Sequence, residues 1–278
     1  MDSMRSDNEA NGGFAKGEFT SLADRYHELM AFRKEGLARY GSRLYYQIYG
    51  PRPRISFPVV TCRKPDFQSI RVGPLFIGDR PPVVHFIDAI LSLPSRPRTI
   101  VEIGPGRGDL CEYVLRKRGN DVKAYYGVER DPNVRGAYVR VNSLDEIPDD
   151  VDVAIASEVA EHMTADNFVS EYLAPLSDRM RLESTLLVTV PNPIVAGGIA
   201  RDYSHVQSWP WYDMYAVLRL FFGDVEVRRT HYIADPKRLA MLPLRFIIAH
   251  AQETDWCEGL VFTARRPLAA RFSVDEER

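Results

Sequence analysis

The chain has 278 residues, of which 45% are hydrophobic, and its 36 basic and 38 acidic residues give a formal net charge of −2. This composition is typical of an ordinary globular protein with enough apolar residues for a sizeable core. The near-balance of charge argues against binding to DNA or another polyanion through overall charge. Three scattered cysteines, Cys62, Cys111 and Cys257, exclude a disulfide framework and a cysteine-based zinc site.

The N-terminal residues 1–17 are polar and lack the apolar core of a signal peptide. No apolar run in the sequence approaches membrane-spanning length, so we expect a cytoplasmic protein without membrane insertion. Charge is nevertheless uneven, because residues 31–80 hold ten basic and three acidic residues, whereas residues 141–171 hold nine acidic residues and no Lys or Arg. These stretches predict two solvated faces or, alternatively, a basic arm that meets an acidic substrate or a membrane surface.

In chain order, residues 1–18 predict a disordered tail, and the apolar spacing from 22 to 39 predicts a helix. Residues 50–97 are rich in proline, which disfavours long regular elements apart from a helix near 82–93. We expect residues 19–97 to form a helical and Pro-rich cover over the remaining chain.

From residue 98 onward, short β-branched runs alternate with helical segments, which predicts an α/β fold with a mostly parallel sheet and helices on both faces. A late insertion, residues 235–256, is expected to cap the site or to build a homodimer contact. The seven expected strands are 99–103, 124–128, 137–141, 151–156, 186–190, 225–232 and 260–264. The expected helices are 109–118, 165–180 with Pro175 disturbing it, and 210–222 closed by Gly223.

The strongest chemical signal is a strand that ends in Glu102 and runs into a glycine-rich turn, with the sequence VEIGPGRGDL over residues 101–110. Without a Cβ at Gly104, Gly106 and Gly108, the turn can take positive φ and bring its amides close to a bound nucleoside. A glycine turn used only for packing is the alternative interpretation.

A second acidic residue, Glu129, follows Gly104 by 25 positions and ends the next predicted strand, where a carboxylate can accept both ribose hydroxyls. The position three after Gly106 is Asp109, so the loop reads G-x-G-x-G and lacks the third glycine of the dinucleotide fingerprint. A nicotinamide-dependent oxidoreductase is therefore the weaker alternative.

At these residues the sequence resembles the class I S-adenosylmethionine (SAM)-dependent methyltransferases, whose first motif is E/D-x-G-x-G-x-G. The resemblance covers about residues 97–266 and implies SAM as the cofactor and a seven-stranded sheet with an antiparallel last strand. It implies that Glu102 holds the methionine end, that Ser143 or Leu144 flanks adenine, and that Ser157 and Glu158 close over the cofactor. The other implied cofactor contacts are Gly104, Pro105, Gly106, Gly108 and Glu129.

Residues 152–163, DVAIASEVAEHM, resemble the fourth strand and the following segment of ubiquinone-type O-methyltransferases, in which a Glu-His pair recurs. The ending VPNP at residues 190–193 is also familiar in that group. Only about eight residues separate Val128 from Ala137, fewer than a parallel crossover helix needs. We therefore expect the second helix of the family to be missing or shortened.

SAM carries an activated methyl group, so the protein mainly aligns an acceptor and removes one proton. His162, beside Glu161, is a candidate base or, alternatively, a histidine that only hydrogen-bonds backbone. His205 resembles a family histidine before the next helix and is expected to line the site. Glu161, His162 and His205 are therefore our catalytic candidates, and we assign no metal ligand.

A metal site is kept as an alternative, because Glu158, Glu161 and His162 stand at i, i+3 and i+4 and His205 could complete a four-ligand set. This pattern resembles the magnesium site of small-RNA 3′-terminal 2′-O-methyltransferases. Three further histidines are taken as structural: His85, His231 and His250. The aromatic residues Trp209, Trp211, Tyr212 and Tyr215 predict either core packing or one wall of an acceptor pocket.

Together these features predict a SAM-dependent methyltransferase that acts on a hydroxyl, or an amine, of a small-molecule metabolite. One alternative is a metal-dependent RNA 2′-O-methyltransferase, favoured by the basic stretch and by the Glu-x-x-Glu-His segment. Another is a non-catalytic SAM-fold protein that binds a partner.

Overall fold

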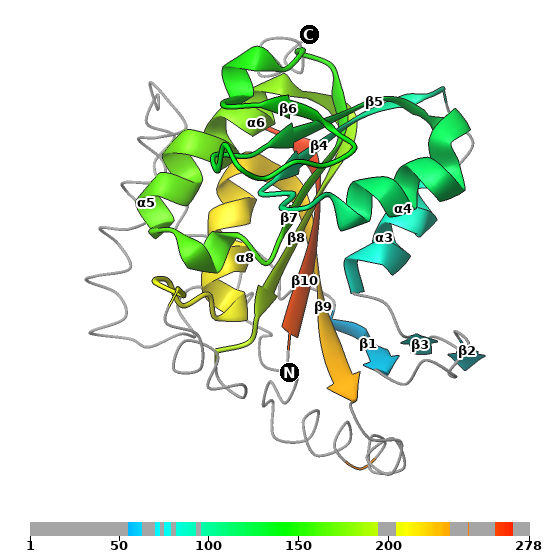
Figure 1. The fold of residues 1–278 in the computed structure, drawn as a ribbon. Helices are drawn as coiled ribbons and strands as arrows, with labels where there is room; N and C mark the ends of the chain where they lie inside the picture. Colours follow the sequence, from blue (N-terminus) through cyan, green and yellow to red (C-terminus); the bar gives the residue numbers. More distant parts are fainter. Residues whose placement is uncertain are drawn as a thin grey trace, which may run out of the picture.

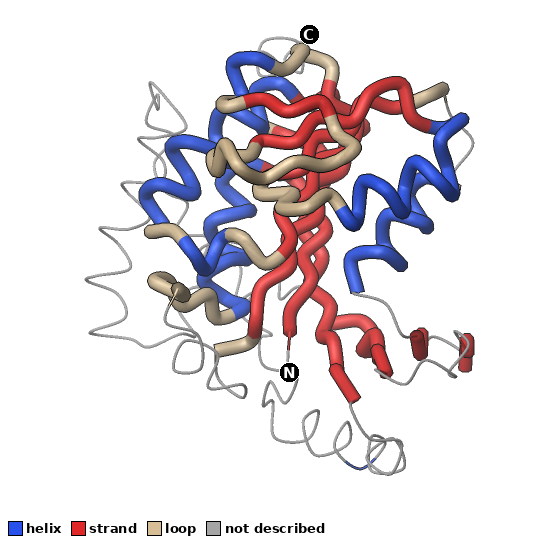
Figure 2. Tube along the Cα trace, viewed as in Figure 1, coloured by secondary structure: helices blue, strands red, loops and turns tan. Residues whose placement is uncertain are grey.

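The computed structural model describes residues 55–62, 70–72, 75–78, 82–92, 96–193, 204–233, 244 and 259–268. Their strands form a single ten-stranded sheet in the order β2-β3-β1-β9-β10-β8-β7-β4-β5-β6. Helices lie on both faces of this sheet (Figure 1). Figure 2 shows the same layers, with the strands between two groups of helices.

Seven of the strands are those that the sequence predicts. β4 lies between β5 and β7 and pairs in parallel with both, while β5 pairs in parallel with β6 and β7 with β8. β10 is antiparallel to both β8 and β9, which confirms the mostly parallel sheet with an antiparallel last strand. Their bounds are β4 (Arg98–Ile103), β5 (Val122–Val128), β6 (Val139–Val141), β7 (Val151–Ser157), β8 (Met180–Pro191), β9 (Phe222–Ile233) and β10 (Gly259–Pro267).

Three further strands come from the Pro-rich segment that the sequence predicts as a cover. β1 (Ile55–Cys62) pairs in parallel with β9 and with β3 (Leu75–Gly78), and β2 (Ile70–Val72) closes the edge antiparallel to β3. These residues therefore extend the sheet and do not cover it. β9 would otherwise be an edge strand with unpaired backbone groups. The register of β1 on β9 shifts between Ser56 and Val59, around Pro58, which has no N–H to donate.

Two hydrophobic clusters fill the space between the sheet and the helices. On one face, α3 (Pro82–Leu91) and α4 (Asp109–Arg118) pack over the sheet. The other face is covered by α5 (Ala165–Asn167), the π-helical turn η4 (Phe168–Leu173), α6 (Ala174–Arg179) and α8 (Trp211–Phe221). Short 3₁₀ turns are η1 (Gly119–Asp121), η2 (Leu144–Glu146) and η3 (Ala160–His162).

Two predicted helices differ in detail from the structure. The helix expected over 165–180 changes from α-helical to π-helical and back, and Pro175 falls in the first turn of α6, where its missing N–H is tolerated. The helix expected to close at Gly223 ends earlier, because Phe222 is already extended, with φ −134° and ψ 135°, and begins β9. Gly223 therefore belongs to a strand and does not cap the helix.

The predictions for the N-terminal tail, for the helix over 22–39 and for the insertion 235–256, except residue 244, lie outside the described residues. No helix in the described part of the chain combines the length and apolar character needed to cross a bilayer.

Candidate functional site

The site lies where β4, β5, β6, β7 and β8 end, because parallel strands place the loops after their carboxyl ends along one edge of the sheet. The ends of β4 and β7, the loops that follow β4, β5, β6 and β7, and residues 204–210 before α8 carry the cofactor and catalytic candidates that the sequence predicts. The sheet thus collects residues from about 100 positions of sequence at one edge.

The glycine turn after β4 has the backbone conformation that its sequence predicts. Gly104, Gly106 and Gly108 all have positive φ, at 61°, 52° and 82°. Gly104 N donates to Val128 O at 3.0 Å, which ties the turn to the end of β5, and Gly108 N donates to Pro105 O at 2.9 Å. A Cβ built on Gly106 would meet nothing within 4 Å, so this glycine faces open space beside the turn.

Glu129 follows β5 and lies against the same turn. Its Oε2 accepts a hydrogen bond from Gly106 N at 3.2 Å, and its Oε1 accepts one from Asp131 N at 2.9 Å. The half-buried carboxylate therefore reaches the part of the turn that is open to a ligand. Its role in accepting hydrogen bonds from ribose hydroxyls stays a prediction.

Glu102 is more enclosed than the resemblance implies, with 5% of its surface exposed. Its Oε2 accepts a hydrogen bond from the Tyr125 hydroxyl at 2.6 Å. Burial raises the pKa of Glu102 to about 7; the Tyr125 hydrogen bond opposes this shift, and the charge of Asp109 adds to it. Its place at the methionine end of a cofactor stays a prediction.

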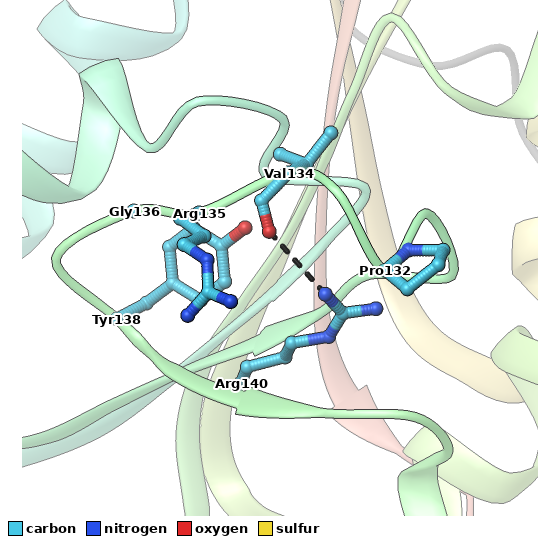
Figure 3. A pocket seen from close by; sticks show the side chains of 6 residues that line it. All are labelled: Pro132, Val134, Arg135, Gly136, Tyr138 and Arg140. Carbon is cyan, nitrogen blue, oxygen red and sulfur yellow. Dashed lines mark hydrogen bonds between the residues drawn. The ribbon is translucent and has the colours of Figure 1, made fainter.

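The connection from β5 to β6 contains no helix within residues 129–138, as the short spacing predicts. Instead, Arg140 donates to Val134 O at 3.3 Å and to Glu129 O at 2.9 Å, which holds the connection as a compact loop. A pocket of about 430 Å³ opens here, shown in Figure 3. Its lining residues are Pro132, Val134, Arg135, Gly136, Tyr138 and Arg140.

The two residues predicted to flank adenine are placed differently. Ser143 is exposed at the end of β6, whereas Leu144 is 3% exposed and its side chain packs in the core. Of the two side chains, that of Ser143 is accordingly the one open to a ligand. Pro105 is buried at the base of the glycine turn.

The residues after β7 are held by the neighbouring strand β8. Ser157 Oγ lies 3.0 Å from Thr189 Oγ1, and Thr189 Oγ1 donates to Glu158 Oε1 at 2.8 Å. Glu158 has a positive φ of 54°, and its carboxylate turns back toward Thr189 although the residue is exposed. Desolvation raises the pKa of this carboxyl, and the Thr189 hydroxyl and the charge of His205 oppose that shift.

The three catalytic candidates come together. Ligand atoms of Glu161, His162 and His205 all lie within 4.8 Å of one another. The two imidazole rings are 4.7 Å apart between centroids, at an angle of 74°. Glu161 is 2% exposed, whereas His162 is exposed and His205 is half-buried. Glu158, the fourth residue of the predicted ligand pattern, lies outside this three-residue cluster.

Hydrogen bonds between two distant segments create the Glu161–His162–His205 cluster. Val206 N and Gln207 N donate to Glu161 O at 2.8 and 3.1 Å, and Trp209 Nε1 donates to Ala160 O at 2.9 Å. These bonds fix the segment before α8 along η3. His162 Nδ1 lies 3.3 Å from Ser204 O, so in the tautomer with the proton on Nδ1 the Nε2 lone pair is available.

The aromatic residues around the start of α8 mostly serve the core. Trp209 and Tyr215 are buried, and Trp209 makes an edge-to-face contact with Phe168 at 5.8 Å between ring centroids. Trp211 packs against the same core while half-buried. The side chain of Tyr212 and those of the three histidines predicted as structural, His85, His231 and His250, lie outside the described residues.

Three site residues were not anticipated from the sequence: Tyr125, Tyr138 and Thr189. Tyr125 and Thr189 each bond a predicted acidic residue from a neighbouring strand. For Tyr138 a signal was present, since Gly127 lies inside a strand and Gly136 stands two residues before the tyrosine. A glycine inside a strand indicates close approach of another group.

No protein-family model and no curated protein matches the sequence. Among solved structures, a SAM-dependent methyltransferase from Archaeoglobus fulgidus is similar, with a TM-score of 0.50 and 18% identity over 66% of this chain and 92% of that one. One from Mesorhizobium loti has a TM-score of 0.42 and 17% identity over 66% of this chain and 98% of that one.

A phosphoethanolamine N-methyltransferase from Haemonchus contortus has a TM-score of 0.43 and 12% identity, over 84% of this chain and 59% of that one. At these identities the likeness establishes the fold alone, and the argument for the fold rests on the Archaeoglobus structure. The chain has the class I fold shared by SAM-dependent methyltransferases. The nearer resemblance to ubiquinone-type enzymes stays a prediction.

Proposed function

We propose that this protein is a SAM-dependent methyltransferase that transfers a methyl group to a hydroxyl. The observation that carries the proposal is the glycine turn after β4, with three positive-φ glycines, open space beside Gly106 and the Glu129 carboxylate against it. Gly119 also has open space beside it but caps a helix with negative φ, so the positive φ angles and the Glu129 contact are what distinguish the turn. The fold shared with SAM-dependent methyltransferases supports the same reading.

When bound, SAM supplies an electrophilic methyl group on a sulfonium. The glycine turn would bring its backbone against the nucleoside, and Glu129 would accept hydrogen bonds from the ribose hydroxyls. The protein then needs to orient an acceptor and to take its proton. His162 is suited to that role, because it is exposed beside the loops at the carboxyl edge of the sheet and its Nε2 can accept a proton.

The Glu161–His162–His205 cluster favours the use of a divalent cation in the reaction. A buried carboxylate and two imidazoles within 4.8 Å offer oxygen and nitrogen ligands for a divalent cation. Such a cation would supply Lewis acidity toward an acceptor hydroxyl. We propose Glu161, His162 and His205 as its ligands. Because the Nε2 lone pair of His162 cannot bind a cation and accept a proton at once, His162 would be the base only in a metal-free reaction.

Two classes of molecule are candidates for the methyl acceptor. One is a hydroxyl, or an amine, of a small metabolite. The other is a ribose 2′-hydroxyl at the end of an RNA, and the observed cluster favours it, because Glu161, His162 and His205 belong to the pattern that resembles small-RNA 2′-O-methyltransferases. We therefore place the RNA hydroxyl ahead of the small metabolite.

The cofactor is tested by isothermal titration of the protein with SAM and with its demethylated product, S-adenosylhomocysteine. Gly106→Arg fills the open space beside the turn, so we expect it to abolish binding, and Glu129→Ala to weaken binding at least tenfold through loss of charge-assisted hydrogen bonds. Gly119→Arg is the matched control, since that glycine also meets nothing within 4 Å but caps α4 with a negative φ of −55°. Absent binding by folded wild-type protein would overturn the proposal.

The acceptor is tested with a short RNA that has a free terminal 2′,3′-diol, with radiolabelled SAM, and with or without Mg²⁺ or Mn²⁺. Methylation of the 2′-hydroxyl makes the RNA resistant to periodate, and the same RNA with a 2′-deoxy end is the control. Label transfer that needs the metal and the 2′-hydroxyl supports the RNA candidate. Transfer to small hydroxyl compounds but not to RNA would favour the metabolite.

A further inference from the structure

Tyr138 contacts the cofactor turn from a loop that replaces a helix. Its side chain is 7% exposed, and its hydroxyl donates to Gly106 O at 2.8 Å. Gly106 is also the residue whose N–H bonds Glu129. Both backbone polar groups of Gly106 are therefore hydrogen-bonded, the N–H to the Glu129 carboxylate and the C=O to the Tyr138 hydroxyl.

Three glycines make room for the Tyr138 ring. A Cβ on Gly127 would lie 2.3 Å from Tyr138 Cδ2, and a Cβ on Gly136 would lie 2.3 Å from Cε1. A Cβ on Gly108, in the turn itself, would lie 3.2 Å from the same ring. These distances are too short for any other residue at Gly127 or Gly136 unless the ring moves. The ring thus lies in a slot formed by β5, its own loop and the turn.

The loop that carries Tyr138 is itself held in place. Arg140, on β6, donates to Val134 O and to Glu129 O, and β6 pairs with β5 from Tyr126 to Val128. Figure 3 shows the hydrogen bond from Arg140 to Val134 O, with Tyr138 at the end of the same loop. Burial raises the pKa of the Tyr138 phenol, so the hydroxyl stays protonated and able to donate near neutral pH.

We propose that Tyr138 is a positioning residue for SAM, which holds the glycine turn in its binding conformation through the Tyr138–Gly106 hydrogen bond and the three-glycine slot. In most α/β folds a crossover helix follows the second strand of such a unit. Here that helix is absent from residues 129–138, and the tyrosine supports the turn in its place. This inference rests on the proposed function, since it concerns the same cofactor.

The test compares Tyr138→Phe with Tyr113→Phe by titration with SAM and S-adenosylhomocysteine. Tyr113 is the matched control, because it is 8% exposed and its hydroxyl donates to Asp88 Oδ2 at 2.6 Å, between α4 and α3. Both variants lose one hydrogen bond from a buried phenol and should lose similar thermal stability. We expect Tyr138→Phe alone to weaken binding, by roughly 3- to 10-fold. Equal affinities for the two variants would overturn the inference.

A second arm uses the slot. Gly127→Ala is chosen because the three nearest atoms to its Cβ all belong to Tyr138. In the wild-type background it should displace the ring and weaken binding, whereas adding Gly127→Ala to Tyr138→Ala should have little further effect. If Gly127→Ala weakens binding by the same factor alone and together with Tyr138→Ala, Gly127 acts independently of Tyr138, which would contradict the inference.

A third arm does not depend on the cofactor. Hydrogen exchange at the amides of Gly104, Gly106, Arg107 and Gly108 should be faster in Tyr138→Phe than in Tyr113→Phe, because the turn loses its support. If wild-type protein fails to bind SAM, the proposed function fails, and this exchange measurement still decides whether Tyr138 holds the conformation of the turn. Unchanged exchange would overturn that role.

Discussion

Val159 lies directly over Gly104: a Cβ built on the glycine would sit 2.8 Å from Val159 Cγ2. The contact joins the turn after β4 to the segment after β7. All three of the nearest atoms to that Cβ belong to this one valine. The two loops of the site are therefore packed with no space between them at this point.

Gly104→Ala is expected to destabilise the protein and to weaken SAM binding, because it adds both this clash and an alanine at φ 61°. The positive φ alone costs roughly 1–2 kcal/mol. Urea unfolding and titration with SAM measure the two effects. The double variant Gly104→Ala/Val159→Ala should recover the part due to the clash but not the part due to φ; no recovery at all would show that Val159 is not the obstacle.

Glu102 is expected to make stability depend on pH. The pKa of Glu102 is about 7 in the folded protein, and its ordinary value of 4.5 applies to the unfolded chain. Between pH 4.5 and pH 7 the folded protein therefore holds a proton that the unfolded chain has released. The free energy of unfolding should therefore fall by roughly 2–3 kcal/mol between pH 5 and pH 8, most steeply below pH 7, and level off above. Urea unfolding at a series of pH values measures this.

Two variants test whether Glu102 causes that pH dependence of stability. Glu102→Gln cannot ionise, so its stability should change less over this range than that of the wild type. Tyr125→Phe removes the hydrogen bond that lowers the Glu102 pKa, so the fall should extend to higher pH. Parallel pH curves for wild type and Glu102→Gln would assign the dependence to other groups.

Metal binding is expected at the Glu161–His162–His205 cluster. Titration with Mn²⁺, followed by electron paramagnetic resonance, should show one bound ion in the wild type. Glu161→Gln and His205→Ala should each weaken binding at least tenfold, since each removes one of three ligands.

Glu183→Gln is the control for metal binding, because this exposed carboxylate lies near the start of β8, at the opposite end of the strand from Thr189 and the site. It should bind Mn²⁺ like the wild type. Binding that survives both Glu161→Gln and His205→Ala would place the ion elsewhere and would remove the support for metal-assisted transfer.

Trp209→Phe is expected to lower the free energy of unfolding by roughly 1–3 kcal/mol, because it leaves the buried carbonyl of Ala160 without the indole N–H. It should also weaken Mn²⁺ binding, since Trp209 holds the segment that carries His205. Chemical denaturation and metal titration measure the two. Tyr113→Phe should lower stability alone; a Trp209→Phe protein with unchanged metal affinity would show that the backbone bonds to Glu161 suffice.

The sequence by itself determined the class of fold and the conformation of the glycine turn. Alternating β-branched runs and helical segments predict a layered α/β sheet, and glycines at 104, 106 and 108 predict positive φ, because both are local properties of the chain. The sequence also predicts the absence of a helix between Val128 and Val139, because the connection is too short for a crossover helix.

Only the tertiary structure decided how the pieces meet. Strand β1, from the Pro-rich segment, pairs with β9, about 170 residues away. His205 reaches His162 because the segment before α8 bonds the backbone of Glu161. Likewise, the Tyr138 ring fits against Gly127 because neighbouring strands bring them together. Such contacts depend on the order of strands in the sheet and on packing between distant segments. Local patterns in the sequence do not predict the free energy of that packing.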